Sequence, residues 1–92
     1  MAHRVIWAAS AQTNLESITR YIAEDSPRRA EIVASKLLDS TERLADFPYS
    51  GRMFAEWQDP DVREIIVYNY RVMYRVSPGL VTVFRVVHAR MS

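Results

Sequence analysis

The spacing of apolar residues in the first half of the chain predicts a short strand followed by two helices. Val5, Ile6 and Trp7 form an apolar run typical of a strand. Apolar residues then recur at steps of three and four, the spacing of one helix face, up to Glu24-Asp25 and again from Ser26-Pro27 to Phe47-Pro48. The two stripes are Ala11, Leu15, Ile18 and Ile22, then Ala30, Val33, Leu37, Thr41 and Leu44. Because only two or three residues join the helices, we expect an antiparallel pair with shared apolar faces. Ser10 and Ser26 are candidate N-caps for the two helices.

The second half of the chain changes to the period of a strand. After Pro48 comes a loop rich in aromatic residues, which we expect to fold back so that Met53, Phe54 and Trp57 cover the helical hairpin. The alternative is that these side chains form an exposed aromatic patch for a partner. β-Branched residues then predict three strands, Val62–Tyr68, Arg71–Ser77 and Leu80–His88, joined by links short enough to require antiparallel neighbours. The predicted fold is a single α+β domain over residues 1–92, of order β-α-α-β-β-β. In it, the N-terminal strand and the antiparallel helical hairpin pack on one face of a mainly antiparallel sheet.

The other face of this sheet carries an unusual pattern. In the strand Arg71–Ser77, Val72, Tyr74 and Val76 share one face, which we expect to meet the helices, and Arg71, Met73 and Arg75 share the other. In the last strand both parities are largely apolar: Phe84, Val86, His88 and Arg90 on one, and Val81, Val83, Arg85 and Val87 on the other. This pattern is typical of a central strand, or of a strand whose outer face is covered by another molecule. A sheet covered by helices on one side only does not need it, so we expect a partner.

Composition narrows the possible chemistry. The chain has 92 residues, no cysteine and two histidines, which argues against disulfides and zinc clusters, and we expect neither a metal nor a cofactor. No apolar stretch is long enough to span a bilayer, and no signal peptide is evident, so a cytoplasmic protein without membrane contact is expected. The net charge of +1 hides an asymmetry: residues 1–64 carry −3, whereas residues 65–92 carry +4 from four arginines and contain no acid. Such a basic segment suits an acidic partner or a nucleic acid.

Taken in order, the motifs of the whole chain resemble the RelE/ParE superfamily of bacterial type II toxins, and ParE more than RelE. The motifs are Val5-Ile6-Trp7, Ser26-Pro27, Phe47-Pro48, Ser50-Gly51-Arg52, Val62-Arg63-Glu64, Tyr70-Arg71-Val72-Met73-Tyr74-Arg75-Val76 and Val86-Val87-His88-Ala89-Arg90. The resemblance implies a small growth-inhibiting toxin, of the kind associated with plasmid stabilisation. It also implies a cognate antitoxin that neutralises the toxin by laying an acidic C-terminal segment across its surface, in a hetero-oligomeric complex.

Two activities are implied by this resemblance. ParE-like members are gyrase poisons that act by protein contact and are not enzymes, whereas RelE-like members are metal-independent endoribonucleases that cleave mRNA on the ribosome. For the nuclease alternative, Arg71 and Arg90 match family arginines, and His88 could serve as general base. However, Lys36 is the only lysine and lies on the second predicted helix, and no tyrosine follows Tyr74. These departures favour the ParE-like activity, with the ribonuclease and an inactive antitoxin-binding member as alternatives.

The candidate antitoxin- or target-binding residues are Arg52, Arg63, Arg71, Met73, Arg75, His88 and Arg90. Each has a structural alternative. Arg71 and Arg75 could form a solvated sheet face, Arg63 could pair with Glu64 along the strand, and His88 could be a hydrogen-bonded residue at a strand end. Gly51 could be a turn glycine beside an Arg52 that anchors the loop. The sequence leaves these alternatives open.

Overall fold

The computed structural model describes residues 2–53 and 56–90, and the expected cover by Phe54 therefore lies outside the described residues. The strands are β1 (Arg4–Trp7), β2 (Arg52–Met53), β3 (Val62–Val67), β4 (Tyr70–Ser77) and β5 (Leu80–His88). The helices are α1 (Ala9–Ala23) and α2 (Pro27–Glu42), and a 3₁₀ turn, η1 (Arg43–Ala45), continues α2. This order confirms the predicted α+β fold and adds β2 within the segment expected to be a loop. No helix within the described ranges is long and apolar enough to cross a membrane.

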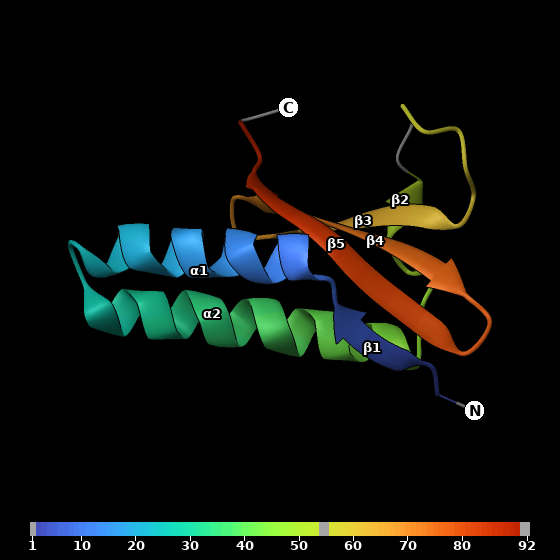
Figure 1. The fold of residues 1–92 in the computed structure, drawn as a ribbon, viewed down its shortest axis with the longest axis horizontal. Coiled ribbons are helices and arrows are strands. Elements are labelled where there is room, and N and C mark those ends of the chain that lie inside the picture. The colour runs from blue at the N-terminus through green and yellow to red at the C-terminus, as the bar shows by residue number, and fades with distance from the viewer. Residues whose placement is uncertain (1, 54–55, 91–92) are drawn as a thin grey trace.

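The two helices lie side by side as an antiparallel pair (Figure 1). The start of α2 confirms the prediction, because Ser26 Oγ accepts a hydrogen bond from the Arg29 amide at 3.1 Å and Pro27 takes the first helical position. The predicted cap of α1 is wrong. Ala8 occupies the N-cap position, and Ser10 Oγ instead donates to the carbonyl of Phe84 at 2.7 Å.

The strands form one five-stranded sheet of order β1-β5-β4-β3-β2. The pairs β3–β4 and β4–β5 are antiparallel as predicted, and β2 adds an antiparallel edge to β3. β1 pairs with β5 in parallel, so the last strand of the chain lies inside the sheet, between the first strand and β4. This placement explains why β5 is largely apolar on both faces.

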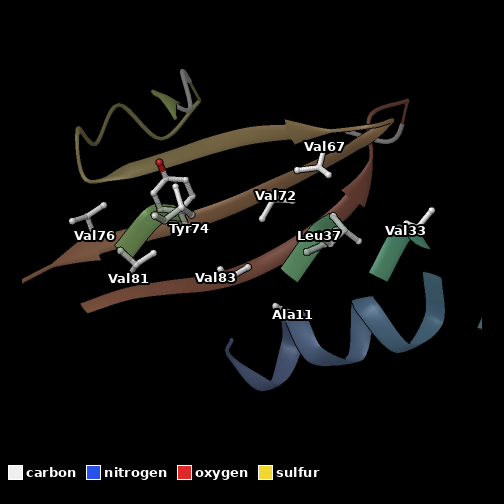
Figure 2. Close-up of a cluster of buried hydrophobic side chains, with 11 residues drawn as sticks. Ala11, Val33, Leu37, Val67, Val72, Tyr74, Val76, Val81 and Val83 are labelled. Carbon is white, nitrogen blue, oxygen red and sulfur yellow. The ribbon is translucent and has the colours of Figure 1, made fainter. Parts of the chain in front are cut away.

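The main core fills the space between the helices and the sheet. Ala11 of α1 and Leu37 of α2 are completely buried against Tyr74 and Val83 (Figure 2). Val72, Tyr74 and Val76 of β4 all belong to this core, which confirms the face predicted for them.

A β-bulge changes which residues of β5 face the helices. Val83 lies opposite Tyr74, but Arg85 lies opposite Met73, so Phe84 is an extra residue in the ladder. As a result Val83 and Val86 both join the core on the helix side, whereas Phe84 packs on the far side of the sheet. The predicted strict alternation along this strand is therefore wrong beyond Val83, because one inserted residue reverses the parity of all that follow.

The sheet face away from the helices is called the outer face below. Val62 and Met73 are buried there, with Phe84 and Val87 packed against them. A second, smaller apolar cluster thus accounts for part of the apolar pattern that predicted a partner.

Candidate functional site

A buried carboxylate organises the arginines of the outer face. The Glu64 side chain is only 5% exposed and accepts two hydrogen bonds from Arg71, from Nε to Oε1 at 2.9 Å and from Nη2 to Oε2 at 3.3 Å. Arg52 of β2 approaches the same carboxylate, with its Nε 3.4 Å from Oε2. This two-pronged contact is the strong geometry for an arginine and a carboxylate, and it fixes the Arg71 guanidinium.

The protonation states follow from this arrangement. Burial acts to raise the pKa of Glu64, but the hydrogen bonds and positive charges of Arg71 and Arg52 outweigh it and hold that pKa below its ordinary value. The hydrogen bond to Glu64 also raises the pKa of Arg71. Both side chains are therefore ionised at neutral pH, and each offsets the charge of the other.

Arg63 does not pair with Glu64, so that structural alternative is wrong. Its Nε donates to the Pro60 carbonyl at 2.8 Å and its Nη1 to the Gly51 carbonyl at 3.1 Å, and the guanidinium lies over the ring of Tyr49. Arg63 therefore fastens the segment between α2 and β3 to the sheet. Consecutive strand residues point to opposite faces, which is why Arg63 and Glu64 cannot share one.

Gly51 is required by a close contact. Its amide donates to Tyr74 Oη at 2.9 Å, and a Cβ at this position would lie 2.5 Å from that oxygen and 2.6 Å from the Glu64 carbonyl oxygen. Burial raises the pKa of Tyr74, so its hydroxyl stays protonated. Glycine is thus required at residue 51 because a side chain there would overlap these atoms. Arg52 beside it contacts Glu64 as described.

The segment before β3 continues onto the outer face. Arg75 pairs with Asp59 at 3.0 Å, and the pKa of Asp59 is lowered by the Asp61 amide and then by Arg75. Trp57 packs against Phe84, with ring centroids 5.6 Å apart. The prediction that Trp57 covers the helical hairpin is therefore wrong: it covers the opposite side of the sheet. A hollow of about 220 Å³ lies between Trp57, Phe84, Arg75 and Thr82.

His88 lies on the other side of the sheet from Arg71. It is paired across the ladder with Tyr70, and their rings meet edge to face at a centroid distance of 5.5 Å. Arg71 is the next residue after Tyr70 and faces the outer side, opposite Val87. Arg90 follows the strand, and its backbone amide donates to His88 Nδ1 at 3.2 Å. The three residues of the ribonuclease alternative are thus not gathered at one site by their side chains.

An apolar groove lies beside His88 on the helix side. It has a volume of about 470 Å³ between α1, which contributes Ile18 and Tyr21, and the strand residues Tyr70, Val86 and His88. Tyr21 is 75% exposed along it. A second hollow of about 410 Å³ shares Tyr70 and His88 and is lined by Ile22 of α1 and by Arg29 and Val33 of α2. These two hollows are called the helix-side groove below.

Two features of the site were missed by sequence reasoning. Asn14 Oδ1 accepts from the Val86 amide at 3.0 Å, so a helix side chain satisfies the backbone of β5. Arg85 is exposed at the bulge, and its guanidinium has no hydrogen bond or ion pair among residues 2–53 and 56–90. Neither feature leaves a local sequence signal, since both depend on the β5 register. Within the same ranges, no cluster of three or more His, Asp or Glu side chains could hold a metal ion.

Both the sequence and the fold of this chain are similar to those of known proteins. The toxin RelE2 of Caulobacter vibrioides is 33% identical over 87 residues, which are 94% of this chain and 94% of that protein. The putative toxin Y4kP of Sinorhizobium fredii is 31% identical over 97% of this chain and 91% of its own length. Among solved structures, a chain of the chromosomal ParDE system of P. aeruginosa matches with a TM-score of 0.76 at 17% identity, covering 95% of this chain and 96% of that one. A chain of the Mycobacterium tuberculosis RelBE2 toxin–antitoxin complex matches with a TM-score of 0.69 at 17% identity, covering 96% of this chain and 99% of that one.

The family assignment rests on nearly the entire sequence. A family model described as the ParE toxin of the type II toxin-antitoxin system parDE matches residues 5–92. The match spans every strand and helix except the first residue of β1. Together with the relatives at more than 30% identity, it shows that this chain belongs to the ParE toxin family of type II toxin–antitoxin systems, within the RelE/ParE superfamily.

Proposed function

We propose that this type II toxin inhibits DNA gyrase by direct protein contact and is not a nuclease. The observation that carries the proposal is the separation of Arg71 from His88. Arg71 is held by Glu64 on the outer face, and His88 packs against Tyr70 on the helix side.

Cleavage of RNA through its 2′-hydroxyl requires a base within hydrogen-bond reach of that hydroxyl and cations around the same phosphate. A base and a cation on opposite faces of a sheet cannot act on one phosphate. The charge of Arg71 is also already offset by a carboxylate, and Lys36 lies on α2 in the other layer. These features support a toxin that acts as a binding protein.

The partner that neutralises the toxin is its antitoxin, and we propose that an amphipathic, acidic antitoxin segment covers the helix-side groove. The apolar lining from Ile18, Tyr70 and Val86 suits the apolar side of such a segment, and Arg29 suits its acidic side chains. Covering the groove would remove Tyr21 from water.

The alternative is a ribosome-dependent mRNA endoribonuclease, which the RelE2 name of the Caulobacter relative favours. The deciding experiment runs a gyrase supercoiling assay beside a ribosome-dependent mRNA cleavage assay on the same purified toxin. We expect inhibition of supercoiling, no mRNA cleavage, and unchanged inhibition by the His88→Gln variant. Cleavage of mRNA that leaves gyrase untouched, and that is lost in His88→Gln, would establish the alternative. Normal cell growth on expression without antitoxin would instead indicate an inactive member.

A further inference from the structure

We propose that Arg85, together with the hollow beside Trp57 and Phe84, is the surface on which this toxin docks an acidic segment of its target protein. The inference rests on the proposed function, under which that segment belongs to gyrase. It assigns target contact to Arg85, which is not among the candidate binding residues that the sequence analysis names.

The arginines that β4 and β5 present on the outer face differ in whether a carboxylate pairs with them. Arg71 is bound to Glu64 and Arg75 to Asp59, so both guanidinium groups are already paired with carboxylates. Arg85 is exposed and makes no hydrogen bond or ion pair with any part of the chain that the structure describes. An open guanidinium beside paired ones is the group available to a partner's carboxylate.

The bulge in β5 places Arg85 on the outer face. It lies opposite Met73, so its side chain leaves the sheet on the outer face, next to the apolar pair Phe84 and Val87. β1 ends opposite Val83, so none of the strands in the described residues flanks this side of β5 at Arg85. The bulge thus places the Arg85 guanidinium beside the outer apolar cluster. Without the bulge, strict alternation would turn Arg85 toward the helices.

A hollow of about 220 Å³ lies at Phe84, the residue before Arg85. It is lined by Trp57, which is 50% exposed, and by Phe84, Thr82 and Arg75. This space can receive one apolar side chain of a partner. Tryptophan and arginine are both among the residue types most enriched at energetically dominant positions of protein interfaces.

The charges next to the hollow favour an acidic peptide over a nucleic acid. A phosphate backbone is bound by a series of open cations, whereas Arg75 and Arg71 are here compensated by Asp59 and Glu64. Arginines already neutralised by carboxylates contribute little to the binding of successive phosphates. One open arginine next to an apolar hollow matches a carboxylate next to an apolar side chain.

The test compares Arg85→Glu with Arg28→Glu, the same change of charge at an exposed position of α2. Both toxins are assayed for inhibition of gyrase supercoiling, for binding to purified gyrase subunits and to a short labelled single-stranded RNA, and for antitoxin binding as a measure of folding. We expect Arg85→Glu to weaken gyrase binding by about tenfold or more, with Arg28→Glu unchanged and antitoxin binding retained by both. Trp57→Ala should also weaken gyrase binding, and Trp57→Phe should largely restore it.

Equal gyrase inhibition by Arg85→Glu and the unaltered toxin would overturn the inference, as would a selective loss of RNA binding in Arg85→Glu. If the unaltered toxin leaves gyrase untouched, the proposed function fails, and growth arrest in cells then tests the surface alone. Loss of growth arrest in Arg85→Glu but not in Arg28→Glu would support the docking surface for another target protein. Equal growth arrest by both would overturn it.

Discussion

The side-chain oxygen of Asn14 accepts a hydrogen bond from the backbone amide of Val86, 3.0 Å away. β1 ends opposite Val83, so on that side of β5 the part of the chain that the structure describes provides no strand beyond this residue. Ser10 and Asn14, one turn apart on α1, satisfy the Phe84 carbonyl and the Val86 amide in its place. An exposed strand edge is a site for unwanted pairing with other chains, and here a helix closes it with polar side chains.

The edge contact predicts the effect of changing Asn14. Asn14→Ala removes the acceptor of the Val86 amide and should lower the free energy of unfolding by about 1 kcal/mol. Amide hydrogen exchange at Val86, followed by NMR, should become faster. Asn14→Asp keeps an acceptor oxygen and should restore most of the protection; equal exchange rates in Asn14→Ala and the unaltered protein would show that the contact contributes nothing.

The contact between Gly51 and Tyr74 predicts that no side chain fits at residue 51. Gly51→Ala should lower the free energy of unfolding by roughly 1–3 kcal/mol, because its Cβ would overlap Tyr74 Oη and the Glu64 carbonyl. Gly79 is the control: it has a φ of 71° and open space around it, so Gly79→Asn should cost little. Urea denaturation of both variants decides the matter, and similar losses would argue against a steric cause at Gly51.

The burial of Glu64 predicts an acid-sensitive stability. Because Arg71 and Arg52 hold the pKa of Glu64 below its ordinary value, the unfolded chain takes up its proton first as the pH falls. The stabilisation is therefore complete at neutral pH and is lost below about pH 5 as Glu64 is protonated. Glu64→Gln should cost about 2–3 kcal/mol at pH 7 and show a flatter dependence of stability on pH.

The matched control for this experiment is Asp59→Asn, which breaks the exposed pair with Arg75. Its loss at neutral pH should be smaller than that of Glu64→Gln, because solvent screens both partners. Denaturant midpoints measured from pH 7 to pH 3.5 test both variants. A slope for Glu64→Gln as steep as that of the unaltered protein would place the acid sensitivity elsewhere.

The helix-side groove predicts where antitoxin binding can be disrupted without unfolding the toxin. Tyr21→Glu places a charge on an exposed wall of the groove and should weaken antitoxin binding by about tenfold or more. Ile32→Glu is the control, since Ile32 is 51% exposed on α2 and lines neither hollow. Calorimetric titration with the cognate antitoxin measures both, and equal affinities would place the antitoxin on another surface.

Most of the fold could be predicted because it follows from local periodicity. The helical stripes ending at Ile22 and Leu44, and the strand alternation of Val72, Tyr74 and Val76, each reflect a regular repeat that the structure preserves. The parallel pairing of β1 with β5 left no comparable signal, since it joins residues more than seventy positions apart.

Much less of the site could be predicted, because it depends on exceptions to that regularity. The bulge at Phe84 reversed the parity of the end of β5, and so decided the faces of Arg85 and His88. The partner of Glu64 was decided by its orientation on the outer face, which favoured Arg71 over its sequence neighbour Arg63. Serine is a common helix cap, which is why the sequence predicts this role for Ser10. Its actual hydrogen bond to the Phe84 carbonyl depends on the position of β5, which no local pattern indicates.

Because β1 pairs with β5, the sheet of this toxin can be completed only near the end of synthesis. β5 is the last strand to be made, yet it is the ladder partner of both β1 and β4. A nascent chain that has not yet reached residue 80 therefore lacks the strand that joins β1 to β4, and with it the core residues Val81, Val83 and Val86. The helix-side core is likewise complete only when β5 has been made.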